Sequence, residues 1–181
     1  MRINMRAKYT RSSIAASLLL GMISTQSVMA ENTTNVYFKG EIVESACGLS
    51  PDSLNQTIEL GQQPTHKFKV KGDRSTPVPF RVKLTDCDSS TLKKAVFRFE
   101  SNPDTTGELF NVEGGATGIG VRILHNGNPI NNGDIAATNV LVNGTNIASF
   151  SAAYEMNVEA GPKAVTAGNA ESWALLRVSY L

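Results

Sequence analysis

Side chains that could carry out chemistry are few in this sequence, and their spacing does not suggest a catalytic site. A nucleophile needs a base within reach, and His66 and His125 are the only histidines. No G-x-S-x-G motif is present, so a serine hydrolase elbow is excluded. Asp86 and Asp88 flank Cys87 and could serve acid–base chemistry or bind calcium. At the end of a strand such a pair more often lies in a solvated turn. We therefore predict that the chain is not an enzyme and holds no metal and no cofactor.

One alternative function is the binding of a carbohydrate. Trp173 is the only tryptophan, and together with Tyr154 it could form a platform on which a sugar ring stacks. A single tryptophan in a late strand more often packs against its own domain. The alternative to be tested is a monomeric secreted carbohydrate-binding β-sandwich.

Cys47 and Cys87 are the only cysteines. An even pair in an exported chain is most simply a disulfide. It would close a loop of about forty residues, for which the loop-entropy model gives roughly 4 kcal/mol. A metal or redox site is the competing interpretation, but no C-x-x-C is present and the histidines are distant in sequence.

The first thirty residues predict export. Arg2, Arg6, Lys8 and Arg11 form a basic head, an apolar run follows over residues 14–23, and residues 28–30 resemble a signal-peptidase site. The alternative is a membrane anchor, but about ten apolar residues are too few for a bilayer that needs about 20. We predict a signal peptide over residues 1–30 and no membrane span in the mature chain.

Length and charge restrict the remaining possibilities. At 181 residues the chain is about one domain, because domains average roughly 150 residues. Cleavage after residue 30 removes four of the 17 basic residues and none of the 16 acidic ones, which leaves a net charge of 13 − 16 = −3. No basic surplus remains to bind a phosphate backbone, so nucleic-acid binding is not expected.

The elements that would position these residues are predicted to be strands. Apolar and polar residues alternate over 78–84, over 119–123 and over 150–154, which is the period of a β-strand with one apolar face. Turn formers such as Asn126-Gly127 and Asn143-Gly144 separate these runs. Short strands at this spacing with little helical periodicity predict an all-β antiparallel sandwich or barrel.

Both ends of the predicted mature chain also alternate. Near the start, apolar or small residues occupy every second position from Thr34 to Ile42, and near the finish they do so from Ala174 to Tyr180. Chain ends usually fray unless they are docked. Both ends therefore look like strands that need a neighbour.

Several motifs in one order resemble the pilin subunits of bacterial chaperone–usher fimbriae, the type 1 fimbrial family in particular. The resemblance covers residues 31–181. A glycine fourteenth from the end and a penultimate aromatic are its most specific features, here Gly168 and Tyr180. The other matching stretches are residues 38–43 before Cys47, residues 56–61, residues 78–84 before Asp86-Cys87, and residues 118–124.

The resemblance implies an incomplete immunoglobulin-like β-sandwich that lacks its last strand, with an N-terminal extension that serves as a donor strand. It implies a structural subunit of a fimbria on the surface of a Gram-negative bacterium, exported through the periplasm and contributing to cell adhesion. A periplasmic chaperone lends a strand to the gap, and at the outer-membrane usher the extension of a neighbouring pilin subunit replaces that strand.

The resemblance also assigns residues. It implies a signal peptide over 1–30, an N-terminal extension over 31–44 and a pilin domain over 45–181. Gly40 falls where donor strands of the family keep a glycine, because the site that receives it is shallow. The predicted donor strand consists of Thr34, Val36, Phe38, Gly40 and Ile42, and the predicted acceptor and chaperone edge consists of Gly168, Ala174, Leu176, Val178, Tyr180 and Leu181, with the disulfide between Cys47 and Cys87.

Overall fold

The computed structural model describes residues 33–40 and 45–181. The chain divides into two units between residues 41 and 42. In the first unit, residues 33–40 form neither helix nor strand, and all of them are exposed to solvent. The predicted signal peptide over residues 1–30 lies outside the described residues.

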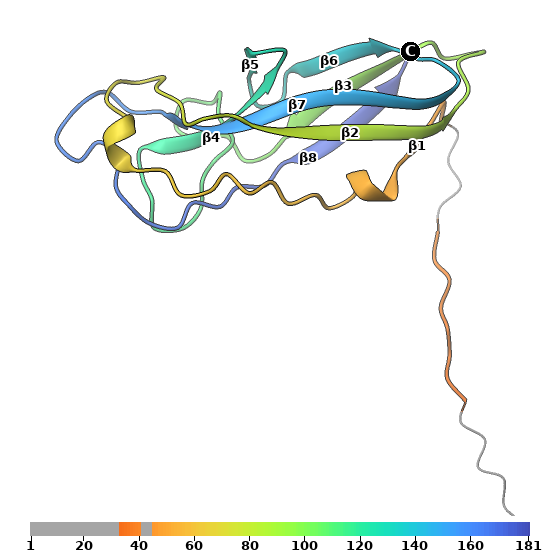
Figure 1. Cartoon of the computed structure of the whole chain (residues 1–181), viewed down its shortest axis with the longest axis horizontal. Helices are drawn as coiled ribbons and strands as arrows, with labels where there is room; N and C mark the ends of the chain where they lie inside the picture. The colour runs from red at the N-terminus through yellow and green to blue at the C-terminus, as the bar shows by residue number, and fades with distance from the viewer. Residues whose placement is uncertain (1–32, 41–44) are drawn as a thin grey trace, which may run out of the picture. The chain divides into compact units, whose positions relative to one another are not determined.

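The regular secondary structure of the second unit consists of antiparallel strands and two single turns of 3₁₀ helix (Figure 1). The strands are β1 (Gly48–Leu49), β2 (Val78–Cys87), β3 (Lys94–Glu100), β4 (Ile119–His125), β5 (Asn128–Ile130), β6 (Ile135–Val140), β7 (Gly144–Met156) and β8 (Leu175–Tyr180), and two single turns of 3₁₀ helix, η1 (Pro51–Ser53) and η2 (Thr65–Lys67), precede β2. They form a five-stranded sheet in the order β1-β2-β7-β4-β5 and a three-stranded sheet in the order β6-β3-β8. The predicted all-β class is confirmed.

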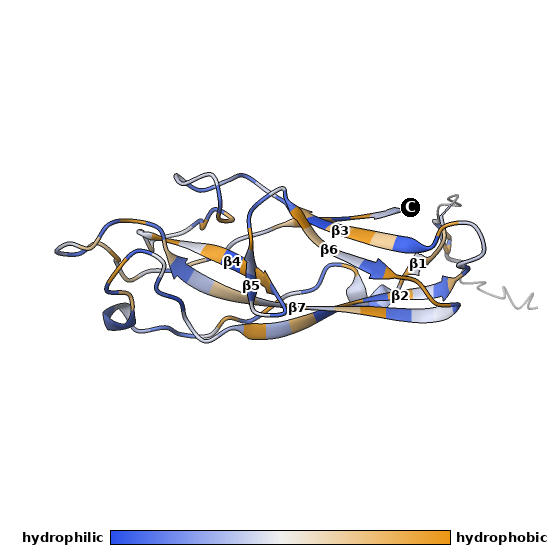
Figure 2. Cartoon of the chain, turned by 90° about the horizontal axis from the view of Figure 1, so that it is seen from above, coloured by the Kyte–Doolittle hydropathy of each residue, from blue (hydrophilic) through white to orange (hydrophobic). Residues whose placement is uncertain are grey.

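The two sheets form two layers, with β3 and β6 in one and β2 and β7 in the other (Figure 2). Strand β2 shows why the sequence folds this way, because Val82 and Leu84 face inward and are almost fully buried while Arg81 is exposed. Between the layers, four aromatic rings pack edge to face or stacked, with Phe99 and Phe150 only 5.0 Å apart between ring centroids. The other two are Phe80 and Phe97, and each also contacts Phe150.

The hairpin between β4 and β5 has the turn that its Asn-Gly sequence favours. Asn126 and Gly127 have φ values of 51° and 80°, and they join His125 to its cross-strand partner Asn128. A two-residue hairpin loop with both φ angles positive strongly favours the dipeptide Asn-Gly. The turn predicted here is confirmed.

Strand β4 differs from the predicted pattern of one apolar and one exposed face. Arg122 lies between Val121 and Ile123 in the alternation, yet it is only 4% exposed. The outer face of β4 is covered, since a Cβ placed on Gly120 would lie 2.7 Å from the Leu109 side chain. The alternation alone does not reveal a covering loop.

Within the residues that the structure describes, no helix has both the length and the apolar character required to cross a bilayer.

Candidate functional site

Strand β8 has a free edge. It pairs with β3 on one side, and the sheet order β6-β3-β8 places it at the border of its sheet among the described residues. Lys94 and Leu181 exchange both backbone hydrogen bonds, at 3.0 Å and 2.9 Å, and this fixes the phase of the ladder. Alternate residues of an antiparallel strand direct their N–H and C=O groups to opposite sides. Leu176, Val178 and Tyr180 therefore direct theirs away from β3, toward the free edge.

The side chains of the same three residues face the interior. Leu176, Val178 and Tyr180 are half-buried and pack against the hydrophobic core, whereas Leu175, Arg177 and Ser179 between them are exposed. Unpaired backbone groups and incompletely covered apolar side chains thus coincide at one edge. An exposed edge of this kind is a ready template for another strand.

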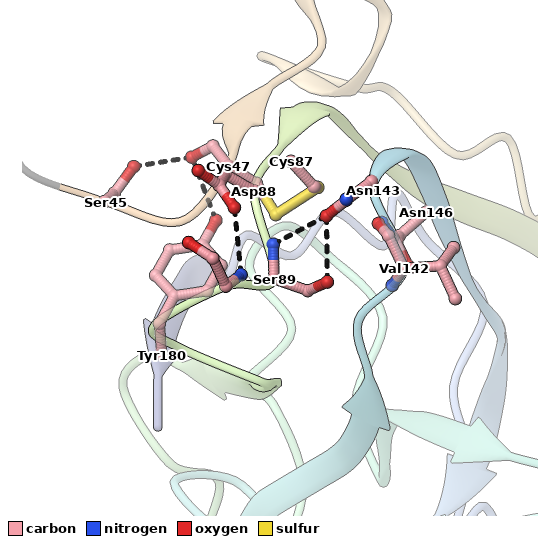
Figure 3. Close-up of a disulfide and its surroundings, with 10 residues drawn as sticks. Ser45, Cys47, Cys87, Asp88, Ser89, Val142, Asn143, Asn146 and Tyr180 are labelled. Carbon is pink, nitrogen blue, oxygen red and sulfur yellow. Dashed lines mark hydrogen bonds between the residues drawn. A yellow bond between two sulfur atoms is a disulfide. The ribbon is translucent and has the colours of Figure 1, made fainter.

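A cluster of contacts marks the C-terminal end of this edge (Figure 3). The Tyr180 hydroxyl donates to the carbonyl oxygen of Cys47 at 3.2 Å, and the Ser45 hydroxyl donates to the same oxygen at 2.6 Å. Burial raises the pKa of Tyr180 above its ordinary value of 10.0. Cys47 forms a disulfide with Cys87, the last residue of β2. The last residue of β8, Tyr180, is thereby connected to the start of the domain.

Three residues of the predicted acceptor edge lie outside the bounds of β8. Ala174 precedes β8 and is exposed, and Leu181 follows β8 with an exposed side chain while its backbone pairs with Lys94. Gly168 lies seven positions before β8, where a Cβ would come within 2.3 Å of the Gly115 carbonyl carbon. Gly168 thus allows close backbone approach between two loops, and its assigned role at the edge stays a prediction.

The predicted donor residues present an apolar surface to solvent. Val36 is 68% exposed and Phe38 is 92% exposed, and Thr34 and Gly40 are exposed as well. Ile42 lies outside the described residues. The assignment of these residues as a donor strand stays a prediction.

Comparison with known proteins connects this edge to a family. The family model described as "Fimbrial protein" matches residues 36–181. The type-1 fimbrial protein C chain of Escherichia coli is 35% identical over 185 residues, which cover 97% of this chain and 99% of that protein. The chain belongs to the fimbrial protein family. The fimbrial subunit type 1 of Klebsiella pneumoniae is 32% identical, over 87% of this chain and 91% of that protein.

Solved structures agree in fold. The P pilus rod subunit PapA matches with a TM-score of 0.66 and 21% identity, over 76% of this chain and all of that chain. A subunit from a chaperone–usher pilus matches with a TM-score of 0.69 and 21% identity, over 84% of this chain and 98% of that chain. The protein is a structural fimbrial subunit, exported through the periplasm to a fimbrium on the surface of a Gram-negative bacterium.

The two aspartates that flank Cys87 were candidates for acid–base chemistry or calcium binding. Asp86 lies in β2 rather than in the predicted turn, and it is exposed with a φ of 53° at a register irregularity between Leu84 and Cys87. Asp88 accepts the Ser90 backbone N–H at 2.9 Å, and hydrogen bonds from Ser90 lower the pKa of this carboxyl. Within residues 33–40 and 45–181, no three side chains among His, Cys, Asp and Glu are arranged to hold a metal ion.

The residues of the sugar-binding alternative do not form an evident platform. Trp173 is 54% exposed on the segment before β8. Tyr154 is half-buried, and its hydroxyl donates to the Ala170 carbonyl at 2.6 Å. Burial and the nearby Glu59 and Glu171 carboxylates raise the pKa of Tyr154 above its ordinary value of 10.0. This ring therefore packs against its own domain.

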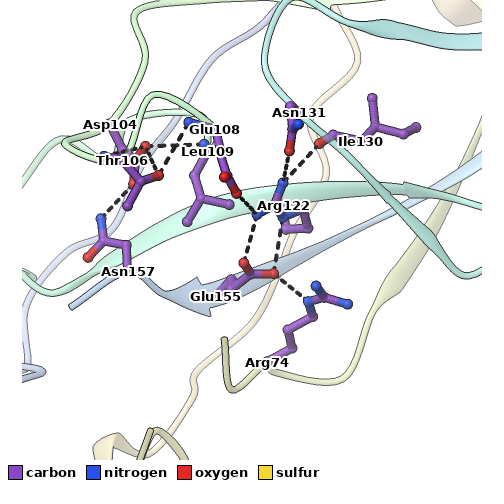
Figure 4. Close-up of polar contacts among 10 residues, drawn as sticks. All are labelled: Arg74, Asp104, Thr106, Glu108, Leu109, Arg122, Ile130, Asn131, Glu155 and Asn157. Carbon is purple, nitrogen blue, oxygen red and sulfur yellow. Dashed lines mark hydrogen bonds and ion pairs between the residues drawn. The ribbon is translucent and has the colours of Figure 1, made fainter. Parts of the chain in front are cut away.

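Sequence reasoning missed a buried ion-pair cluster (Figure 4). Arg122 on β4 and Glu155 on β7 lie on neighbouring strands, with Nη2 and Oε1 2.8 Å apart. Arg122 also binds Glu108 at 3.2 Å, and Arg74 donates to the other Glu155 oxygen. Arg122 Nε donates to Glu155 Oε2 at 3.1 Å, and Nη1 donates to the Asn131 side-chain oxygen at 2.8 Å and to the Ile130 carbonyl at 3.3 Å. Every N–H of the Arg122 guanidinium is thus matched by an acceptor.

The pKa values of this cluster follow from its contacts. Burial alone would raise the pKa of Glu155, but hydrogen bonds and charges from Arg122 and Arg74 outweigh burial and hold it below its ordinary value of 4.5. Burial likewise opposes the charge of Arg122, and Glu155 and Glu108 reverse that effect, so its pKa is raised. The cluster binds β4, β7 and two covering loops together and belongs to the scaffold of the fimbrial subunit.

Proposed function

We propose that this fimbrial subunit polymerises by donor-strand exchange at the free edge of β8. The N-terminal extension of one subunit, through Thr34, Val36, Phe38, Gly40 and Ile42, adds to the edge formed by β8 of the subunit that precedes it in the fibre. Main-chain hydrogen bonds hold the added strand, and alternate side chains that enter the sandwich select it. The subunit acts as a structural element of the fibre and catalyses no reaction.

The free edge of β8 is the single observation that carries this proposal. Three residues, Leu176, Val178 and Tyr180, offer six backbone groups to a new strand, and each net hydrogen bond contributes about 1 kcal/mol. Val36, Phe38 and Ile42 would each contribute roughly 1.5–3 kcal/mol if fully buried. The ordering of the extension subtracts from this gain. The apolar donor residues that are exposed in the described extension are of the type that such an edge would bury.

The proposal includes two assembly partners. A periplasmic chaperone would cover the β8 edge before assembly, because an exposed edge with half-buried apolar residues favours aggregation. An outer-membrane usher would then bring the extension of the next subunit to the same edge. Basic residues in the chaperone cleft would bind the Leu181 carboxylate, as the resemblance implies.

Amide hydrogen exchange tests the β8 edge directly. A peptide of residues 31–44 should slow exchange at Leu176, Val178 and Tyr180 of the mature subunit. The amides of Arg177 and Ser179 should change little, because β3 already binds them. A Lys39→Leu peptide should act like the wild-type peptide, since Lys39 would point outward. A Gly40→Leu peptide should fail, because its side chain would have to enter a shallow site.

Two results would contradict donor-strand exchange. One is full protection of the amides of Leu176, Val178 and Tyr180 in the isolated subunit. The other is equal protection by the wild-type and Gly40→Leu peptides. Chaperone dependence gives a separate check, because a mature subunit that accumulates as a soluble monomer equally well with and without a chaperone would instead support the sugar-binding alternative.

A further inference from the structure

The outward face of β8 and β3 carries a group of charged side chains that does not contact the core. Arg177 is 61% exposed at its side chain, and its Nη2 lies 3.3 Å from a Glu100 carboxylate oxygen on β3. Arg98 stands directly opposite Arg177 and shares Glu100, with its Nε 3.8 Å from the other oxygen. Two arginines thus share one carboxylate, and the outermost of them, Arg177, borders the free edge.

The donor extension has an outward face that would meet Arg177. If Val36 and Phe38 enter the sandwich, then Asn35, Tyr37 and Lys39 point outward, because side chains alternate along a strand. All strand pairs described in both sheets are antiparallel, so the added strand is expected to run antiparallel to β8. Residues directly opposite each other then lie on the same face, with outward donor residues beside Leu175, Arg177 and Ser179.

Registers that keep this parity differ by steps of two residues. A slip of four would place Glu41 opposite Arg177, but it would leave Thr34 and Val36 past the end of β8 without a partner. A slip of two residues in one direction would place Lys39 directly opposite Arg177, and like charges in that position are destabilising. A slip of two in the other direction would place Thr34 opposite Val178 and would leave Tyr180 without a predicted donor residue opposite it. The register between them pairs Phe38 with Leu176, Val36 with Val178 and Thr34 with Tyr180, and it places Gly40 opposite Ala174, directly before β8. On the outward face it pairs Tyr37 with Arg177, Asn35 with Ser179 and Lys39 with Leu175.

We infer that Arg177 selects the register of the donor strand from a second copy of this chain, by accepting Tyr37 and rejecting Lys39. The inference rests on the proposed donor-strand exchange. A guanidinium that lies over a tyrosine ring gains cation–π attraction, and Glu100 holds Arg177 on the outward face of β3 and β8. Lys39 lies opposite Leu175 in this register, two residues away from the arginine.

Disulfide trapping in assembled fibres tests the register. Outward donor residues form non-hydrogen-bonded pairs with β8, where Cα atoms lie about 4.5 Å apart, within the range that a disulfide spans. The variant Asn35→Cys with Ser179→Cys reports the inferred register. The matched control Asn35→Cys with Leu181→Cys reports the slip that opposes Lys39 and Arg177, and Thr33→Cys with Ser179→Cys reports the opposite slip while Arg177 stays in place.

Fibres of the full chain are sheared from cells, denatured without reductant and separated by size. We expect a ladder of crosslinked multimers mainly from the Asn35→Cys, Ser179→Cys variant. A ladder mainly from either control would overturn the inferred register and leave donor-strand exchange intact. A crosslink confined to monomers would overturn the second copy as donor. Fibres that give no ladder with any of the three variants would also overturn the inferred register, whereas donor-strand exchange itself is tested by the hydrogen-exchange experiment above.

A third substitution tests the role of Arg177. With Arg177→Ala added, the repulsion of Lys39 and the attraction of Tyr37 both disappear. The ratio of the Ser179 crosslink to the Leu181 crosslink should fall by about fivefold or more. Lys94→Ala is the control, because Lys94 is another exposed cation of the same sheet, on β3, and should leave the ratio unchanged. An unchanged ratio in Arg177→Ala would show that Arg177 does not select the register.

Discussion

At the scale of single residues, the stability of this subunit depends on the buried carboxylate of Glu155, which neutralises the buried Arg122 guanidinium. We predict that Glu155→Gln destabilises the mature subunit by about 3–5 kcal/mol at pH 7, because it leaves the buried Arg122 guanidinium without its main counter-charge. The change is measured as a lower urea midpoint by circular dichroism. Glu159→Gln is the matched control, since Glu159 pairs with Lys71 at the surface and should change stability by less than about 1 kcal/mol.

The Glu155 carboxylate also makes the free energy of unfolding depend on pH. The pKa of Glu155 is lower in the folded subunit than its ordinary value of 4.5, so the unfolded chain binds this proton more tightly. The stabilisation is therefore present above about pH 4.5 and is lost as the pH falls through the folded pKa. The gap between the wild type and Glu155→Gln should shrink between pH 7 and pH 3, and a gap that stays constant would contradict this account.

Arginines also show why parts of the site could not be predicted from the sequence. Arg81 and Arg122 each stand between two apolar residues of a strand, in the local patterns F-R-V and V-R-I. Arg81 is exposed and Arg122 is buried. The difference comes from Glu155 and from the loop around Glu108, which lie 33 and 14 residues from Arg122 in sequence. Local alternation contains no information about such a cover.

At the scale of elements, the free edge of β8 leads to a paired prediction. Val178→Asp should abolish fibre formation, because a charged carboxylate would have to be buried where a donor side chain packs. Ser179→Asp, one residue further and on the exposed face, should leave fibre formation largely intact. Electron microscopy of cells that produce each variant measures the outcome. Normal fibres from Val178→Asp would contradict an acceptor role for the inward face.

The element itself was predictable and the order of strands around it was not. Alternation over residues 174–180 predicts a strand with one apolar face, and the structure forms β8 over Leu175–Tyr180 with the predicted phase. Ala174 fits the alternation but falls outside the strand. Alternation at the chain end suggested a strand that needs a neighbour, and the family resemblance implied that this neighbour comes from another molecule. That β8 has no partner on its outer side among the described residues depends on the strand order, which no local pattern determines.

At the scale of the whole molecule, the predicted pairing of Cys47 with Cys87 is present in the structure. Replacing both cysteines by serine should lower the free energy of unfolding by roughly 2–5 kcal/mol, since the bond closes a loop with a sequence separation of 40. Urea unfolding of the double variant measures this loss. A midpoint equal to that of the wild type would show that the bond does not stabilise the domain.

The position of that bond has a mechanical consequence. In a fibre built by the proposed donor-strand exchange, tension from one neighbour would reach the domain through the chain that precedes Cys47. The first strand there, β1, is held to β2 over only two residues, Gly48 and Leu49. Such a short strand would peel away under a pull, one hydrogen bond after another. The bond from Cys47 to Cys87 passes the load directly to β2, a ten-residue strand that is paired with β7 along most of its length.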